Sequence, residues 1–250
     1  MARNLTYFIS DLHLGASSIK DPHKHERSIC RWLRSIAPTA RTIYMLGDVL
    51  DYWYEYRYVV PRGFTRFLGT LAELTDNGVE VVWLKGNHDI WIFDYLPSET
   101  GVKVIDGAYV TDIDGAGFLM EHGDGVGEMR LSYRLMHSLF RARWAQVLFS
   151  AIHPRWTVNF AHRWSGHSRA TGTRYTQTVL DDNDKLMQFV KSYSKNHPEI
   201  NYYVFGHRHV VVDQKISPTA RILILGDCYE QMTYGVWNGE EFFIKKMKTE

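Results

Sequence analysis

Side chains that can bind a divalent metal ion occur in five short polar motifs spread along this chain. The motifs are Asp11-Leu12-His13, Gly47-Asp48, Gly86-Asn87-His88-Asp89, His122-Gly123-Asp124 and Gly206-His207-Arg208-His209. Carboxylate, amide and imidazole groups in combination suit manganese, iron, zinc or cobalt. The two cysteines, Cys30 and Cys228, lie outside every motif, which argues against a thiolate metal site.

The number of candidate ligands points to a pair of metal ions. The candidates are Asp11, His13, Asp48, Asn87, His122, His207 and His209. This set is too large for one ion and suits two ions if one carboxylate bridges them, and Asp48 is the natural bridge because it is the lone ligand of its motif. Two ions about 3.5–4 Å apart can hold a hydroxide between them and clamp the oxygens of a phosphoryl group.

Apolar segments precede most of the motifs and predict the strands that position them. Strands are expected at 5–10, 43–46, 80–84, 102–105, 109–113, 117–121 and 202–205, with a terminal hairpin at Asn238-Gly239. Helical spacing predicts helices from Asp21-Pro22 to about Ile36, over 64–76 and over 181–194. The alternation of strand and helix in the first part predicts a parallel sheet, and polar residues just after its strands predict a site at the carboxyl edge.

Length and composition predict one α/β domain over residues 1–250 with a helical insertion at 125–177. No apolar run approaches the ~20 residues of a membrane span, and no signal peptide pattern is present, so a cytoplasmic protein is expected. Eight arginines and one acid, Glu128, give the insertion a net charge of +7, which leaves −6 for the rest of a chain whose total is +1. This asymmetry predicts an anionic ligand for the insertion.

The arginines of the insertion are interleaved with large apolar residues, among them Leu139, Phe140, Trp144 and Leu148. One interpretation is an amphipathic lid whose apolar face belongs to the core. A second is a slot for an amphiphilic anion, since guanidinium groups match phosphate and apolar side chains can line a wall. A basic, aromatic helix can also lie on an anionic membrane surface. We favour the amphiphilic anion for the segment as a whole.

The five motifs, in this order, resemble those of the calcineurin-like metallophosphoesterase superfamily. The resemblance implies a four-layer αββα sandwich, with two β-sheets between helices and a helical lid, and two divalent metal ions. It places Asp11, His13, Asp48 and His209 on one ion, and Asp48, Asn87, His122 and His207 on the other. It makes His88 the catalytic residue that is not a ligand, with Asp89 as its orienting partner.

The insertion, with Asp51-Tyr52-Trp53 and the run from Trp164 to Arg169, is similar to one branch, the UDP-2,3-diacylglucosamine pyrophosphatases of lipid A synthesis. This implies hydrolysis of the pyrophosphate to UMP and 2,3-diacylglucosamine 1-phosphate by a metal-bridging hydroxide, with manganese as the usual metal. The implied substrate contacts are Asn87, His88, Ser165 and Arg169. The implied location is the cytoplasmic face of the inner membrane. Many members of that branch carry arginine where this chain has His88.

Two other functions compete with this interpretation. A nuclease or nucleotide phosphodiesterase would use the arginines to bind nucleic acid, but such a surface favours stacking aromatics over the aliphatic residues present here, so no nucleic acid is expected. A non-catalytic metal-binding scaffold is a further alternative, and the intact ligand set argues against it. No obligate protein partner is inferred.

Overall fold

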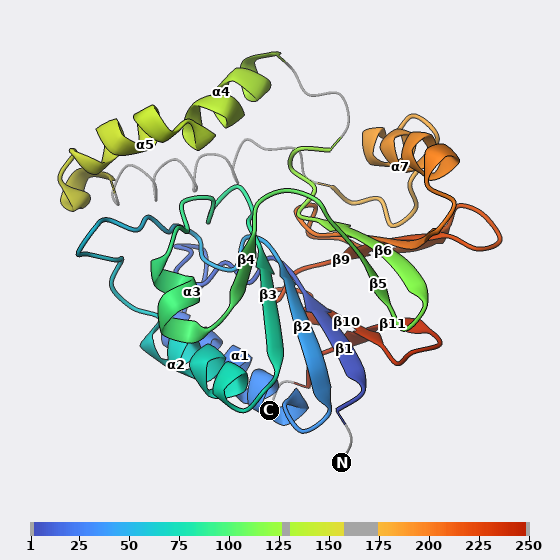
Figure 1. Ribbon diagram of the computed structural model, residues 1–250, viewed down its shortest axis with the longest axis horizontal. Coiled ribbons are helices and arrows are strands. Elements are labelled where there is room, and N and C mark those ends of the chain that lie inside the picture. The colour runs from blue at the N-terminus through green and yellow to red at the C-terminus, as the bar shows by residue number, and fades with distance from the viewer. Residues whose placement is uncertain (1–2, 127–130, 158–174, 249–250) are drawn as a thin grey trace.

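Two β-sheets pack face to face in the computed structural model, with helices on the outer face of each sheet (Figure 1). The structure describes residues 3–126, 131–157 and 175–248. The predicted four-layer α/β sandwich is therefore confirmed. Within the described residues no helix is long and apolar enough to cross a bilayer.

The first sheet has the strand order β11-β10-β1-β2-β3-β4. Its strands are β1 (Leu5–Ile9), β2 (Ala40–Leu46), β3 (Glu80–Leu84), β4 (Lys103–Ile105), β10 (Thr233–Trp237) and β11 (Phe242–Lys246). Strands β1 to β4 are parallel. Strands β10 and β11 form the predicted terminal hairpin, and β10 pairs antiparallel with β1. The carboxyl ends of β1, β2 and β3 consequently meet at one edge of the sheet.

Helices α1 (Pro22–Ile36) and α2 (Thr65–Asp76) cover the outer face of this sheet. The Asp21 side chain caps α1 by accepting the Lys24 N–H at 2.8 Å. Side chains of β1 alternate between two layers. Ile9 packs with residues of α1 and α2, whereas Phe8 packs between the sheets against Phe118, with ring centroids 5.7 Å apart.

The second sheet has the order β5-β6-β7-β9-β8. Its strands are β5 (Tyr109–Ile113), β6 (Ala116–Glu121), β7 (Ile200–Phe205), β8 (Val211–Lys215) and β9 (Arg221–Leu225). Helix α7 (Lys185–Asn196) covers its outer face through Leu186, Met187 and Val190. Because β6 and β7 are parallel neighbours, the motifs that follow them reach the same edge, opposite the motifs of the first sheet.

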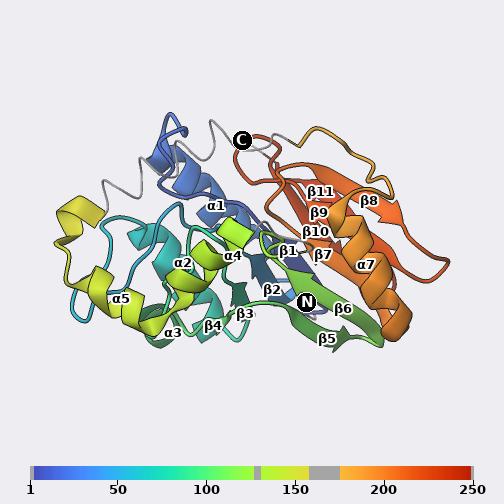
Figure 2. The same cartoon turned by 90° about the horizontal axis from the view of Figure 1, so that it is seen from above.

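Helices α4 (Leu131–Arg141) and α5 (Arg143–Ser150) lie across the edge where the carboxyl ends of the strands emerge (Figures 1 and 2). Aromatic residues of the core loops hold them. The Tyr54 hydroxyl donates to the Gln146 carbonyl at 2.6 Å, and Trp91 Nε1 donates to the Phe140 carbonyl at 2.9 Å. Both helices fall within the predicted insertion 125–177. Its residues 127–130 and 158–174 lie outside the described part of the chain, so the insertion as a unit stays a prediction.

Two helices differ from the sequence-based prediction. Helix α3 (Tyr95–Thr100) was not predicted, because six residues carry little helical periodicity and its first turn is held from elsewhere. The buried Glu55 carboxylate accepts the N–H groups of four consecutive residues, 93 to 96. Helix α7 begins at Lys185, later than the predicted 181, because the Asp184 side chain accepts the N–H groups of Leu186 and Met187 and so caps the helix there.

Candidate metal centre

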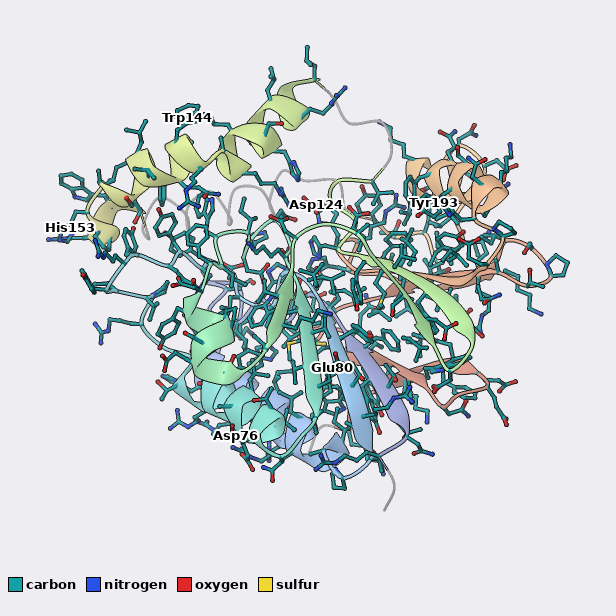
Figure 3. All side chains as sticks on the ribbon, viewed as in Figure 1. Asp76, Glu80, Asp124, Trp144, His153 and Tyr193 are labelled. Atoms are coloured by element: carbon teal, nitrogen blue, oxygen red, sulfur yellow. The ribbon has the colours of Figure 1, made fainter. Side chains whose placement is uncertain are left out.

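The predicted ligands of all five motifs come together between the carboxyl ends of the two sheets. Each motif directly follows a strand: β1, β2 and β3 in the first sheet, and β6 and β7 in the second. Asp124, in the turn after β6, lies between the α4–α5 pair, which carries Trp144, and α7, which carries Tyr193 (Figures 2 and 3). The site is therefore flanked by helices on two sides.

One group of ligands consists of Asp11, His13 and His209, which offer ligand atoms within 4.8 Å of one another. Asp11 Oδ1 lies 3.3 Å from His209 Nε2 and 3.8 Å from His13 Nε2. The two imidazole Nε2 atoms are 3.3 Å apart. Three donor atoms thus face a common point, which is the arrangement that a single ion requires.

The second group consists of Asp48, His122 and His207, again within 4.8 Å. Asn87 joins it, because its Oδ1 lies 3.2 Å from His122 Nε2. Asp48 Oδ2 lies 3.3 Å from His122 Nε2 and 3.7 Å from His13 Nε2. This single oxygen therefore lies next to both groups, which is the position that a bridging carboxylate would occupy.

Each of the two carboxylates is anchored by one oxygen and presents the other to the site. Asp48 Oδ1 accepts the His88 N–H at 2.9 Å, and Asp11 Oδ2 accepts the His207 N–H at 2.9 Å. Asp11 Oδ1 is buried without a hydrogen-bond donor. A buried carboxylate oxygen in this state is costly unless a cation lies against it. The donor set and this oxygen fit a pair of divalent ions.

A backbone carbonyl next to His122 Nδ1 and a carboxylate next to His13 Nδ1 orient these two imidazoles with Nε2 toward the site. His122 Nδ1 donates to the Leu46 carbonyl at 2.8 Å, so the neutral ring carries its lone pair on Nε2. His13 Nδ1 lies 3.3 Å from Asp51 Oδ1. Burial and the neighbouring His122 lower the pKa of His207 to about 4, which keeps this ring neutral at pH 7 and available as a ligand.

In the absence of a cation, Asp48 and His122 stabilise each other's charged forms. Burial opposes ionisation of Asp48, but His122, His88 and His13 outweigh it and hold its pKa well below the usual range. Burial likewise opposes charge on His122, while Asp48 raises the pKa of that imidazole well above its usual range. A divalent cation bound between them would replace the proton, so metal binding is expected to release protons.

Glycines allow the strand ends to approach this closely. A Cβ at Gly86 would lie 2.2 Å from Asp48 Oδ1, and one at Gly206 would lie 1.8 Å from Ser10 Oγ and 2.6 Å from Asp11 Oδ2. Real side chains cannot occupy such positions. The glycine of the third motif therefore limits where Asp48 can lie, and that of the fifth limits where Asp11 can lie.

The backbone of the ligand turns is strained. Five of the predicted ligands, Asp11, His13, Asp48, His207 and His209, have φ between 44° and 66°, in the left-handed region. Non-glycine residues avoid this region at a cost of about 1–2 kcal/mol each. Such strain is typical of functional sites, where the surrounding structure holds side chains in a required orientation.

His88 lies beside the two groups, and Asp51 holds its ring. His88 Nδ1 donates to the Asp51 carbonyl at 2.9 Å, and Nε2 lies 3.8 Å from Asp48 Oδ2. Asp51 also contacts His13, so it links a predicted ligand to the predicted catalytic residue. Sequence reasoning did not assign Asp51 a role. Its place three residues after Asp48 was the available signal.

Asp89, which the resemblance makes the orienting partner of His88, accepts its hydrogen bonds from other groups. The buried Asp89 carboxylate accepts the N–H groups of Gly86, Val49 and Leu50 and the indole N–H of Trp83, at 2.7 to 3.4 Å. The turn directs Asp89 into the core behind the site while His88 faces Asp48. Asp89 therefore ties the second and third motifs together. Burial and the charge of Asp48 raise its pKa.

Three further residues that the sequence singled out have different outcomes. Trp53 is fully buried and donates its indole N–H to Glu55 at 3.0 Å, so it supports the loop beneath the site and does not line it. The predicted substrate contacts Ser165 and Arg169 lie outside the described residues, and their role stays a prediction.

The site described above, with its sandwich of two sheets, defines a metal-dependent phosphoester hydrolase. The model of the calcineurin-like phosphoesterase family matches residues 5–211, and the chain belongs to this family.

Individual relatives narrow the comparison. UDP-2,3-diacylglucosamine hydrolase of Porphyromonas gingivalis is 43% identical to this chain, over 98% of each protein. The protein of the same name from Aeromonas salmonicida is 25% identical over 90% of this chain and 87% of its own. A dimetal phosphatase from Danio rerio has a TM-score of 0.49 at 14% identity and covers 97% of this chain and 95% of that one.

Proposed function

We propose that this protein hydrolyses the pyrophosphate bond of UDP-2,3-diacylglucosamine and releases UMP and 2,3-diacylglucosamine 1-phosphate, with manganese as its metal. The observation that carries the proposal is an apolar pocket whose wall includes Trp91, two residues after the third metal motif, in a chain that is 43% identical throughout to a hydrolase of that name. Pocket and metal centre together suit a substrate with both a phosphate and an apolar part.

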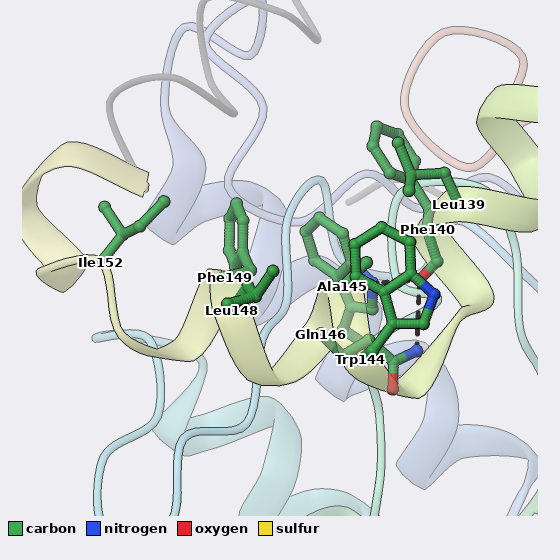
Figure 4. A pocket seen from close by; sticks show the side chains of 9 residues that line it. Leu139, Phe140, Trp144, Ala145, Gln146, Leu148, Phe149 and Ile152 are labelled. Atoms are coloured by element: carbon green, nitrogen blue, oxygen red, sulfur yellow. Dashed lines mark hydrogen bonds between the residues drawn. The ribbon is translucent and has the colours of Figure 1, made fainter.

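The pocket lies between α4, α5 and Trp91, and its volume is about 330 Å³. Its walls are almost entirely aromatic and aliphatic, with Phe140, Trp144, Leu148 and Phe149 among them (Figure 4). Trp91 follows Asp89 by two residues, so the third metal motif leads directly into the pocket wall. Acyl chains of a substrate held at the metal centre would find an apolar environment there.

The residues of the site divide the chemistry between them. Two divalent cations, when bound, would supply Lewis acidity and a deprotonated water as nucleophile. Asp11, His13 and His209 would hold one of them, Asn87, His122 and His207 the other, and Asp48 would contact both. The Asp51 carbonyl fixes the His88 ring through Nδ1, which leaves Nε2 free to donate a proton to the leaving oxygen when the imidazole is protonated.

Incubation of the manganese-loaded protein with UDP-2,3-diacylglucosamine in ¹⁸O-labelled water tests this function. The expected products are UMP carrying the label and unlabelled 2,3-diacylglucosamine 1-phosphate, because attack is expected at the phosphorus of the UMP half. If the protein hydrolyses a simple activated phosphodiester but releases no UMP from the lipid substrate, it remains a phosphoesterase. The assignment of UDP-2,3-diacylglucosamine as its substrate is then wrong.

A second proposal concerns the outer surface of α4 and α5, which we infer to bind an anionic membrane. Apolar side chains there are strongly exposed: Leu135 at 63% and Val147 at 61%. They are interleaved with the arginines of a segment whose net charge is +7. Exposed apolar residues among cationic ones suit the interface of an anionic bilayer, the surface on which the proposed amphiphilic substrate resides.

Sedimentation with vesicles tests the membrane proposal. The protein is expected to sediment with vesicles that contain anionic phosphatidylglycerol and much less with pure phosphatidylcholine. Val147→Asp, which does not line the pocket, is expected to lower the bound fraction several-fold. The exposed Val179→Asp, outside α4 and α5, serves as the matched control. Equal binding of the wild type and the Val147 variant would contradict the assignment.

A further inference from the structure

A second cavity is lined by Arg208 of the fifth metal motif and by Asp184, the N-cap of α7. Its volume is about 260 Å³, and its walls mix polar and apolar groups, among them Tyr175, Gln177, Leu180, Asp184 and Arg208. It therefore differs in chemistry from the apolar pocket under α4 and α5. The residues that line it have no role in the proposed hydrolysis.

Arg208 connects this cavity to the metal centre. It lies between His207 and His209 in the fifth motif, so its backbone is part of the turn that carries two predicted ligands. Its guanidinium donates to both Asp184 carboxylate oxygens, at 2.6 and 3.0 Å, and lies 4.6 Å from the centre of the Tyr175 ring. One wall of the cavity is thus fixed directly to the ligands of the metal centre.

The ion pair between Arg208 and Asp184 holds this wall of the cavity in one geometry without a ligand. The side chains of Arg208 and Asp184 are 10% and 13% exposed, and Asp184 also caps α7 through the Leu186 N–H at 2.8 Å. A bidentate pair between partly buried groups holds both in one geometry. Asp184 accepts two of the five N–H donors of Arg208, and within the described residues no further hydrogen bond engages the other three. Preorganisation of this kind lowers the entropic cost of binding.

The positions of the two cavities suit a substrate with two unlike ends. The apolar cavity lies on the α4–α5 side and the mixed cavity on the α7 side, with the turn that follows β6 between them (Figure 2). A molecule whose pyrophosphate lies at the metal centre, and whose acyl chains occupy the apolar cavity, extends its remaining half toward α7. That half of the proposed substrate is a nucleoside.

We propose that the cavity beside α7 binds the uridine half of the substrate and retains it in the UMP product. This inference rests on the proposed function. Uracil is a planar ring with one N–H donor and two carbonyl acceptors. The exposed Tyr175 ring offers a stacking surface, the Gln177 amide offers both a donor and an acceptor, and Arg208 offers further donors. A cavity just below the ~300–1,000 Å³ of typical small-ligand sites suits one ring with its sugar.

Equilibrium binding of two ligands to the metal-loaded protein tests the inference. The ligands are UMP and ribose 5-phosphate, which share the sugar and phosphate and differ by the base. The wild type is expected to bind UMP more tightly than ribose 5-phosphate. Tyr175→Ala is expected to weaken UMP about tenfold, as loss of one stacking contact does, and to leave ribose 5-phosphate within twofold. Gln177→Ala is expected to weaken UMP in the same selective way, by a smaller factor.

The control variant is Tyr58→Ala, which removes another exposed tyrosine, 85% accessible, away from the cavity. It is expected to leave the affinity for both ligands unchanged. Equal affinity of the wild type for UMP and ribose 5-phosphate would overturn the inference. So would equal weakening of both ligands in Tyr175→Ala, since that result would place the effect on the metal turn and not on the base.

The two proposals fail separately. If UMP is released from UDP-2,3-diacylglucosamine while Tyr175→Ala binds UMP as the wild type does, the hydrolase function stands and the uridine site falls. If Tyr175→Ala selectively loses UMP while the lipid substrate is not cleaved, the nucleoside site stands and the proposed substrate falls.

Discussion

At the scale of single residues, the adjacent side chains of the third motif point in different directions and make different contacts. Asn87 and His88 face the metal ligands, while Asp89 turns into the core and binds four N–H groups. Adjacent residues in one turn thus have unrelated roles. The proposed acid is His88, whereas the contacts of Asp89 support two ligand turns, and separate substitutions should distinguish these roles.

Substitution of His88 should lower turnover without loss of metal. In His88→Ala the proton donor beside Asp48 is gone, while the side chains of the predicted ligands remain. We expect kcat to fall about 10²–10⁴-fold, the usual contribution of a general acid. Metal content measured by mass spectrometry should equal that of the wild type. An equal loss of metal and of turnover would show that His88 acts as a ligand and not as an acid.

Substitution of Asp89 should instead destabilise the fold. Asp89→Asn would place an NH₂ group against N–H donors that the carboxylate now accepts, in a fully buried position. We expect the free energy of unfolding to fall by about 3 kcal/mol, measured by urea denaturation. Glu80→Gln at the exposed start of β3 serves as control. An Asp89 variant with wild-type stability and low kcat would restore the catalytic role predicted from the sequence.

At the scale of elements, the sequence predicted those helices and strands whose apolar residues recur with a regular helix or strand spacing. Helices α1 and α2 and strand β3 were predicted close to their observed bounds because their apolar spacing and their end signals agree. The short α3 lacked such spacing, and its stability comes from Glu55 in a distant loop. Asp51 was missed because it lies outside the five motifs, although its carboxylate lies 3.3 Å from His13 Nδ1 and its backbone carbonyl accepts from His88 Nδ1.

Removal of the Tyr54 hydroxyl should weaken the attachment of helices α4 and α5 to the core. Tyr54→Phe removes the hydrogen bond to the Gln146 carbonyl but keeps the ring, which lies 5.0 Å from that of Phe149. We expect faster tryptic cleavage at the arginines of α4 and α5, with a change of less than about 1 kcal/mol in global stability. Tyr58→Phe, far more exposed, serves as control. Unchanged cleavage in Tyr54→Phe would show that the aromatic contacts alone fix these helices.

The pair of Asp184 and Arg208 should contribute to stability in a way that depends on pH. Burial opposes ionisation of Asp184, but Arg208 outweighs it and holds the pKa below the usual value. The contribution is therefore present above the unfolded pKa and lost as pH falls through the lower folded value. Asp184→Asn should cost about 1–2 kcal/mol at pH 7 and progressively less below pH 4, measured by denaturation at each pH. A cost independent of pH would contradict the ion pair.

At the scale of the whole molecule, two sheets bring together motifs that are up to about two hundred residues apart. Parallel neighbours β1, β2 and β3 align three turns, and β6 and β7 align the other two from the facing sheet. The order of the motifs sufficed to predict this convergence. It did not reveal which carboxylate oxygen faces the ions, because that depends on the glycines and on the left-handed turns.

Titration of the metal-depleted protein with Mn²⁺, followed by electron paramagnetic resonance, tests the central claim that these turns hold a pair of ions joined by Asp48. We predict two ions per chain and the signal of a magnetically coupled pair, as expected for ions about 3.5–4 Å apart. Asp48→Asn should lose the coupling, while Asp76→Asn, an exposed residue far from the site (Figure 3), should keep it. One ion per chain, uncoupled ions in the wild type, or an undisturbed pair in Asp48→Asn would contradict the account.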